Sequence, residues 1–100
     1  MMTSKPPGCW EAAHQLYNEG KKDDAIRVCE QEPCASKSAL CQRFLGWQYY
    51  KKDNLDEALF WFTRAINLGD AESLYGIAGT YFAKNDFINA VKEYRERFCA

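Results

Sequence analysis

The side chains with the most distinctive chemistry in this chain are five cysteines and a single histidine. The cysteines are Cys9, Cys29, Cys34, Cys41 and Cys99, an odd number with no C-x-x-C pair among them. With His14 as the only imidazole, they lack the ligand spacing of a zinc site. We therefore expect no bound metal, and we interpret the cysteines as reduced thiols, several of which pack as small apolar side chains.

No constellation of residues predicts catalysis. The sequence contains neither a glycine-rich phosphate loop nor a nucleophile elbow, and His14 has no cysteine at catalytic range in its own helix. The acidic pairs Asp23-Asp24 and Asp56-Glu57 fall at expected helix starts, where the helix dipole already accounts for negative charge. We expect a protein that is not an enzyme and needs no cofactor.

Three similar segments make up most of the chain and must position these side chains. Each has a turn rich in Lys, Asp and Asn, followed by an alanine and a large apolar residue. The alanines, Ala25, Ala58 and Ala90, are 33 and then 32 residues apart. Self-similarity at this period is typical of stacked units that bury their apolar faces only against each other. The sequence therefore predicts an all-α fold of three antiparallel helical hairpins.

Residues that end helices divide the chain into six expected helices. Gly20, Pro33 and Gly69 are expected to stop helices, with Asp70 capping the next one, and residues 34–38 are expected to form a loop with Ser36 as N-cap. The expected helices cover about 9–19, 22–32, 36–52, 55–68, 71–84 and 87–98. Residues 1–8 hold two prolines and a glycine, so we expect a disordered leader before a single domain over 9–100.

Charge and hydropathy exclude several classes of partner. The net charge is −1, which provides no electrostatic footprint for nucleic acid. No segment approaches the roughly 20 apolar residues that a membrane span needs, and the first residues hold no apolar run of signal-peptide length. We therefore expect a soluble, cytoplasmic protein without nucleic-acid binding or membrane insertion.

The second and third segments resemble known helical repeats. Leu45-Gly46, Tyr49, Ala58, Phe62 and Ala65 resemble the tetratricopeptide repeat, and the junction Gly69-Asp70-Ala71 resembles the related Sel-one-like repeat. The units would cover about 9–33, 36–68 and 71–98. The first unit departs from the pattern at Leu16, Cys29 and Glu32, and the third departs at Arg97. The resemblance implies a short right-handed α-solenoid whose first helices line a concave groove that holds peptides or proteins.

The same resemblance implies which side chains face the groove. Rigid aromatic rings beside arginine are typical of binding hot spots. Gly76 and Gly79 are expected either to open a shallow pocket or to admit close backbone approach. We expect an apolar or amphipathic partner segment. The alternative is that Trp47 and Phe44 only pack between units of a short, irregular array. The expected groove residues are Trp10, His14, Tyr17, Asn18, Arg43, Phe44, Trp47, Tyr50, Lys51, Tyr75, Gly79 and Phe82, with Arg43 and Lys51 supplying charged contacts.

Two features offer alternatives to a groove-binding adaptor. In a cysteine-rich bacterial subgroup of Sel-one-like proteins a disulfide joins neighbouring helices near the positions of Cys34 and Cys41, which would suit an oxidising compartment or a redox sensor. At the end of the array Val91, Tyr94 and Phe98 are expected to stay partly uncovered. That face predicts a homo-oligomer, or a regulatory or inhibitory protein whose partner binds the C-terminal helix.

Overall fold

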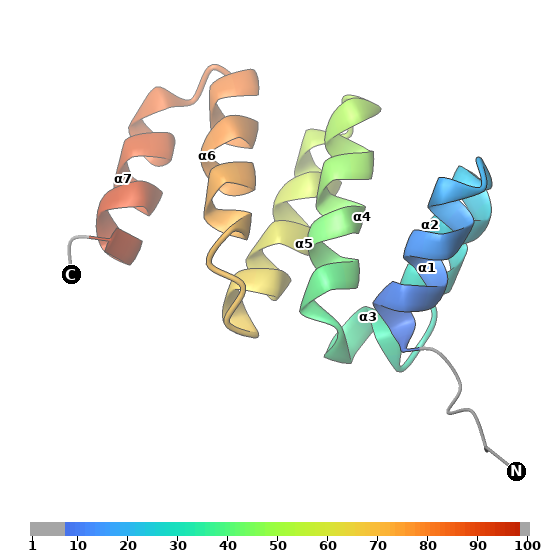
Figure 1. The fold of residues 1–100 in the computed structure, drawn as a ribbon. Helices are drawn as coiled ribbons and strands as arrows, with labels where there is room; N and C mark the ends of the chain where they lie inside the picture. Colours follow the sequence, from blue (N-terminus) through green and yellow to red (C-terminus); the bar gives the residue numbers. More distant parts are fainter. Residues whose placement is uncertain (1–7, 99–100) are drawn as a thin grey trace, which may run out of the picture.

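The backbone of this chain consists of helices joined by short turns. The computed structural model describes residues 8–98, and no strand occurs within them. The all-α prediction is confirmed for this part of the chain, whereas the predicted leader lies outside it except for Gly8. The helices are α1 (Cys9–Asn18), α2 (Lys22–Glu30), α3 (Cys34–Lys37), α4 (Ala39–Lys51), α5 (Leu55–Asn67), α6 (Ser73–Ala83) and α7 (Phe87–Phe98) (Figure 1).

Four of these helices end in the same hydrogen-bonded turn. At the end of α1 the N–H of Gly20 donates to the carbonyl of Tyr17 (3.0 Å), and the N–H of Lys21 donates to that of Leu16 (2.9 Å). The corresponding two bonds close α4, α5 and α6. This Schellman geometry requires one residue with a left-handed backbone, which favours Gly and, after it, Asn and Asp. The left-handed residues are Gly20 (φ 82°), Asp53 (63°), Gly69 (97°) and Asn85 (60°).

The segment between α2 and α4 differs from the sequence prediction. Residues 34–37 form the short helix α3 instead of a loop, and Pro33 precedes its first residue. Proline suits this position because its fixed φ matches the helix and its missing N–H needs no partner. The N-cap of α4 is Ser38 and not Ser36, since the Ser38 hydroxyl accepts a hydrogen bond from the N–H of Cys41 (3.2 Å). Gln42 then fixes α3 to α4 by donating to the Ala35 carbonyl at 2.8 Å.

The start of α6 also lies later than expected, at Ser73. Asp70 still stabilises the start of this helix, because its carboxylate accepts a hydrogen bond from the Ser73 hydroxyl at 2.6 Å. At the last turn of the chain the Asp86 carboxylate accepts from the N–H of Asn89 (3.3 Å), as expected of a residue that caps α7.

Helices that follow each other along the chain pack side by side. The pairs α1–α2, α4–α5 and α6–α7 are in contact, α5 packs on α6, and α4 also contacts α1, α2 and α3 (Figure 1). The result is elongated, with extents of 56 × 29 × 20 Å. Within residues 8–98 no helix has both the length and the apolar character needed to cross a bilayer.

The buried side chains confirm the core positions inferred from the repeat. Ala13, Ala25, Ala58 and Ala90 are all buried, so the paired helices approach each other closely at these points. Phe62 is fully buried, and a Cβ added to Gly46 of α4 would lie only 2.6 Å from its ring. Gly76 of α6 faces the same ring even more closely. Of the two alternatives expected at Gly76, the open pocket is therefore wrong, because the aromatic ring of Phe62 already occupies that space.

Candidate functional site

A concave aromatic site lies between α1 and α4. Its volume is about 390 Å³. The lining positions on α1 and on α4 recur at steps of three and four residues, which is the spacing of one helix face. Each helix therefore contributes one face to the site. We call it the α1–α4 groove; its lining residues are Trp10, His14, Tyr17, Asn18, Leu40, Arg43, Phe44, Trp47, Gln48 and Lys51.

Phe44 forms the floor of the α1–α4 groove. Its side chain is only 8% exposed and belongs to the buried core. Two rings from α1 stand against it: Trp10 at 5.4 Å between centroids and Tyr17, edge-on, at 5.6 Å. Such tilted and edge-on pairs are the favoured arrangements of aromatic rings. Phe44 therefore packs in the core, as the alternative interpretation held, and at the same time supports the Trp10 and Tyr17 rings of the groove.

His14 is held in place by its neighbours on α1. Its ring stacks on Trp10 with centroids 5.3 Å apart and planes within 5°. Its Nε2 lies 3.3 Å from the side-chain nitrogen of Asn18, one helical turn away. The imidazole is exposed, so it presents a polar edge at the rim of the groove.

Arg43 differs from its expected role as a free charged contact. Its guanidinium lies 3.4 Å from the Asp70 carboxylate and also forms an ion pair with Glu72, which joins α4 to the turn before α6. The Arg43 side chain is only 23% exposed. Two carboxylates therefore satisfy its charge, and Lys51, which is exposed and forms no ion pair within residues 8–98, is the cation available to a ligand.

Gln48 is a lining residue that the sequence analysis missed. Its side chain is 3% exposed, and its Oε1 has no hydrogen-bond partner among the described residues. An unpaired buried carbonyl costs free energy, which makes it an unusual occupant of a core. The signal that could have identified it is periodicity, since Gln48 lies four residues after Phe44 on the same face of α4.

The remaining expected groove residues lie elsewhere. Tyr50 packs edge-on against Trp47 (5.5 Å) and does not line the α1–α4 groove. Tyr75 is exposed on α6. Phe82 packs on Phe87 at 5.1 Å and lines a separate cavity of about 310 Å³ between α6 and α7. The expected groove is thus divided into at least two concavities.

The C-terminal helix exposes the apolar face that the sequence predicts. Val91 and Tyr94 are exposed, and Ile88 before them is 83% exposed. A shallow concavity of about 710 Å³ lies along this side of α7. Phe98 ends the helix, but its side chain lies outside the described part of the chain.

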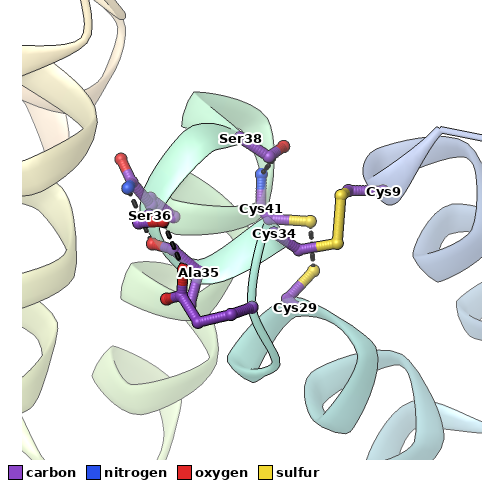
Figure 2. Close-up of a disulfide and its surroundings, with 9 residues drawn as sticks. Cys9, Cys29, Cys34, Ala35, Ser36, Ser38 and Cys41 are labelled. Carbon is purple, nitrogen blue, oxygen red and sulfur yellow. Dashed lines mark hydrogen bonds between the residues drawn. A yellow bond between two sulfur atoms is a disulfide. The ribbon is translucent and has the colours of Figure 1, made fainter.

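The cysteines pair differently from the expectation. Cys34 forms a disulfide with Cys9, with Cα atoms 5.5 Å apart, so the Cys34–Cys41 pairing is wrong, and so is the reduced-thiol interpretation for these two residues (Figure 2). The physical reason is α3, which places Cys34 beside the start of α1. Cys41 instead faces Cys29 of α2, and both are fully buried. Within residues 8–98 no cluster of three or more potential metal ligands occurs.

The electrostatics of Cys29 and Cys41 reflect their contact. While both residues are reduced thiols, a hydrogen bond from Cys29 lowers the pKa of Cys41 to about 7; burial opposes this shift and the Ser38 hydroxyl adds to it. The same contact, together with burial, raises the pKa of Cys29. If both residues are thiols, Cys41 is therefore the one that ionises first.

No protein-family model matches the sequence, and no curated protein matches it significantly. The resemblance to tetratricopeptide and Sel-one-like repeats therefore remains a prediction from the residues named above.

Proposed function

We propose that this chain is a helical-repeat interaction module that binds a segment of another protein in the α1–α4 groove. In this proposal the pairs α1–α2, α4–α5 and α6–α7 stack as a short right-handed solenoid of the tetratricopeptide or Sel-one-like kind. The observation that carries the proposal is the groove itself, where the half-buried Trp10 ring and the exposed Tyr17 ring pack on Phe44 around a cavity of about 390 Å³. A concave, largely apolar site with a few polar groups is the usual form of a ligand site.

The polar groups of the groove define the chemistry of the partner. An apolar or aromatic side chain of the partner would pack on the rings over Phe44. A carboxylate would meet Lys51 at the exposed end of the groove. A hydrogen-bond donor could pair with the Gln48 amide after rotation of its terminal group, because Gln48 both lines the groove and has an unpaired oxygen. We therefore propose an amphipathic, acidic segment as the ligand, and we assign no catalytic role to His14.

Selection of peptides from a random display library on the immobilised protein tests this proposal. We expect enriched peptides to combine aromatic or large aliphatic residues with Asp or Glu. Tyr17→Ala and Lys51→Glu should each weaken their binding by about tenfold or more, which corresponds to the loss of one hot-spot contact. Phe60→Ala is a matched control, because Phe60 is an exposed aromatic residue of α5 that does not line the groove. Peptides that bind the wild type and all three variants equally would contradict the proposal.

The second candidate function is self-association through α7. The observation in its favour is the exposed apolar side of this helix, with Phe87, Ile88 and Val91 along one concavity. A second copy of the chain would cover this face and form the expected homo-oligomer. Sedimentation equilibrium should then show a dimer that Ile88→Asp converts to a monomer. A monomer at every concentration would exclude this candidate.

A further inference from the structure

Cys29 and Cys41 lie too close together for two thiols. Their Sγ atoms are 2.6 Å apart, and both side chains are fully buried (Figure 2). Even an N–H···O hydrogen bond, between smaller atoms, spans about 2.9 Å. Two sulfur atoms at this separation therefore leave no room for the thiol hydrogen that a hydrogen bond between them would need.

The positions of the two residues are set by the surrounding helices and not by flexible chain. Cys29 is in the last turn of α2, and Cys41 is the third residue of α4. Helices α2 and α4 pack against each other, and the Ser38 cap fixes the backbone of Cys41. The short separation is thus a consequence of how two well-defined helices meet.

We infer that Cys29 and Cys41 form a second disulfide next to the Cys9–Cys34 bridge. The inner bridge would join α2 to α4, and the outer one joins α1 to α3. Together they would connect four consecutive helices at one end of the molecule. This inference concerns the covalent state of the protein and does not depend on the proposed groove.

The oxidation can proceed by exchange with a small disulfide such as oxidised glutathione. The Cys41 thiolate attacks one glutathione sulfur, which forms a mixed disulfide and releases one glutathione thiolate. Cys29 then attacks the Cys41 sulfur, releases the second glutathione and transfers its proton to it. The two cysteine sulfurs are oxidised and the two glutathione sulfurs are reduced. Cys41 suits the first role because it lies in the first turn of α4, where the helix dipole favours a thiolate.

The burial of Cys29 and Cys41 predicts at which stage of folding the disulfide exchange occurs and in which kind of compartment. Because both sulfurs are inaccessible in the folded chain, exchange must precede the closing of α2 on α4. The outer bridge has partly exposed cysteines, so reductants reach it more easily than the inner one. Two structural bridges form and persist in oxidising compartments. The inference therefore favours such a compartment over the cytoplasmic location expected from the sequence.

Peptide mapping of the wild-type protein tests the inference directly. The unfolded, reduced chain is refolded in a buffer of reduced and oxidised glutathione, and free thiols are blocked with N-ethylmaleimide in acid. Cleavage after Lys, Arg and Glu separates the four cysteines onto residues 1–11, 28–30, 31–37 and 38–43. We expect 28–30 linked to 38–43, and 1–11 linked to 31–37. Blocked thiols at both Cys29 and Cys41, or any other partner for Cys41, would overturn the inference.

A pair of double variants provides a readout that does not depend on the outer bridge. In Cys9→Ser/Cys34→Ser the inner bridge should still form, and Cys29 and Cys41 should stay unlabelled even when the chain is unfolded in denaturant. The matched control, Cys29→Ala/Cys41→Ala, should retain only the outer bridge. In the folded wild type a phosphine reductant should open the outer bridge at least about tenfold faster than the inner one, since access limits exchange. Equal rates, or labelling of Cys29 and Cys41 in the first variant, would count against a buried second disulfide.

Discussion

The ring of Phe62 on α5 occupies the space where the side chain of Gly76 on α6 would begin. Gly46 on α4 faces the same ring, and a Cβ added there would lie 2.6 Å from it. Phe62 thus fills the interface of three helices, and it can do so only because both neighbours lack a side chain. The absence of a Cβ at two positions far apart in the sequence is what lets α4, α5 and α6 pack at this distance.

Gly76→Ala should destabilise the protein by about 1–3 kcal/mol, the usual cost of overpacking a core. The ring cannot move away because Gly46 limits it on the other side. Urea unfolding followed by circular dichroism measures the change.

Gly79→Ala is the control on the same helix. An added Cβ at Gly79 meets no atom within 4 Å. The substitution should therefore leave stability unchanged or raise it by up to about 1 kcal/mol, because alanine favours a helix more than glycine does. Equal stability of the two variants would show that Gly76 does not make room for Phe62.

Asp86→Ala should weaken the start of α7. The Asp86 carboxylate accepts from the N–H of Asn89 (3.3 Å) and from its side-chain amide (2.7 Å). Loss of such a cap costs about 1 kcal/mol, and hydrogen exchange in the first turn of α7 should become faster. Asn54→Ala is the comparison, since Asn54 precedes α5 without a side-chain cap bond. Asn54→Ala should accelerate hydrogen exchange in the first turn of α5 less than Asp86→Ala accelerates it in the first turn of α7.

Stability should fall at alkaline pH because of Tyr49. A hydrogen bond to the Glu30 carboxylate, with burial and the negative charges of Glu30 and Glu57, raises the pKa of Tyr49 from 10 to about 12. The folded state therefore keeps this proton more tightly than the unfolded chain does. The resulting stabilisation is complete below pH 10 and is lost as the pH rises towards 12.

Absorbance titration of tyrosinate, with Tyr49→Phe used to assign the signal, measures this pKa. Glu30→Gln should lower it towards its ordinary value, because a neutral amide does not oppose the phenolate charge. An unchanged titration in Glu30→Gln would show that Glu30 does not control Tyr49.

Trp47→Ala and Tyr17→Ala should separate packing from binding. Trp47 lines the α1–α4 groove but also packs edge-on against Phe62 at 4.9 Å, so its loss should cost about 3 kcal/mol of stability. Tyr17 is 38% exposed, and its substitution should leave the unfolding midpoint nearly unchanged while weakening peptide binding. If Tyr17→Ala unfolds the protein as Trp47→Ala does, the rings of the groove belong to the core and not to a binding surface.

Much of this structure follows from patterns with a physical basis in the sequence. Helix ends were predictable at Gly20 and Gly69, because a left-handed backbone favours glycine. The core alanines were predictable because the repeat marks where two helices must approach. The groove residues of α1 and α4 were named only through the resemblance to helical repeats, whose first helices face a groove. Gln48 and Leu40 lie at three- and four-residue steps on the same face and were missed.

Other features depend on contacts between distant residues and could not be predicted. A glycine such as Gly76 is compatible with either open space or close packing, and only the position of Phe62 decides between them. The partner of Cys34 depends on α3, a helix of four residues that is too short to show a periodic pattern. Arg43 forms ion pairs with Asp70 and Glu72, which lie 27 and 29 positions later in the sequence, and no local pattern indicates such a pairing.

The two ends of this molecule are secured by different means. The Cys9–Cys34 bond holds one end covalently, whereas α7 at the other end is held chiefly by its packing on α6. Under a stretching force or mild heating the chain would peel away from its last helix inward. Fraying of this kind would leave the aromatic rings around Phe44 in place, so the C-terminal hairpin could be remodelled without disturbing the α1–α4 groove.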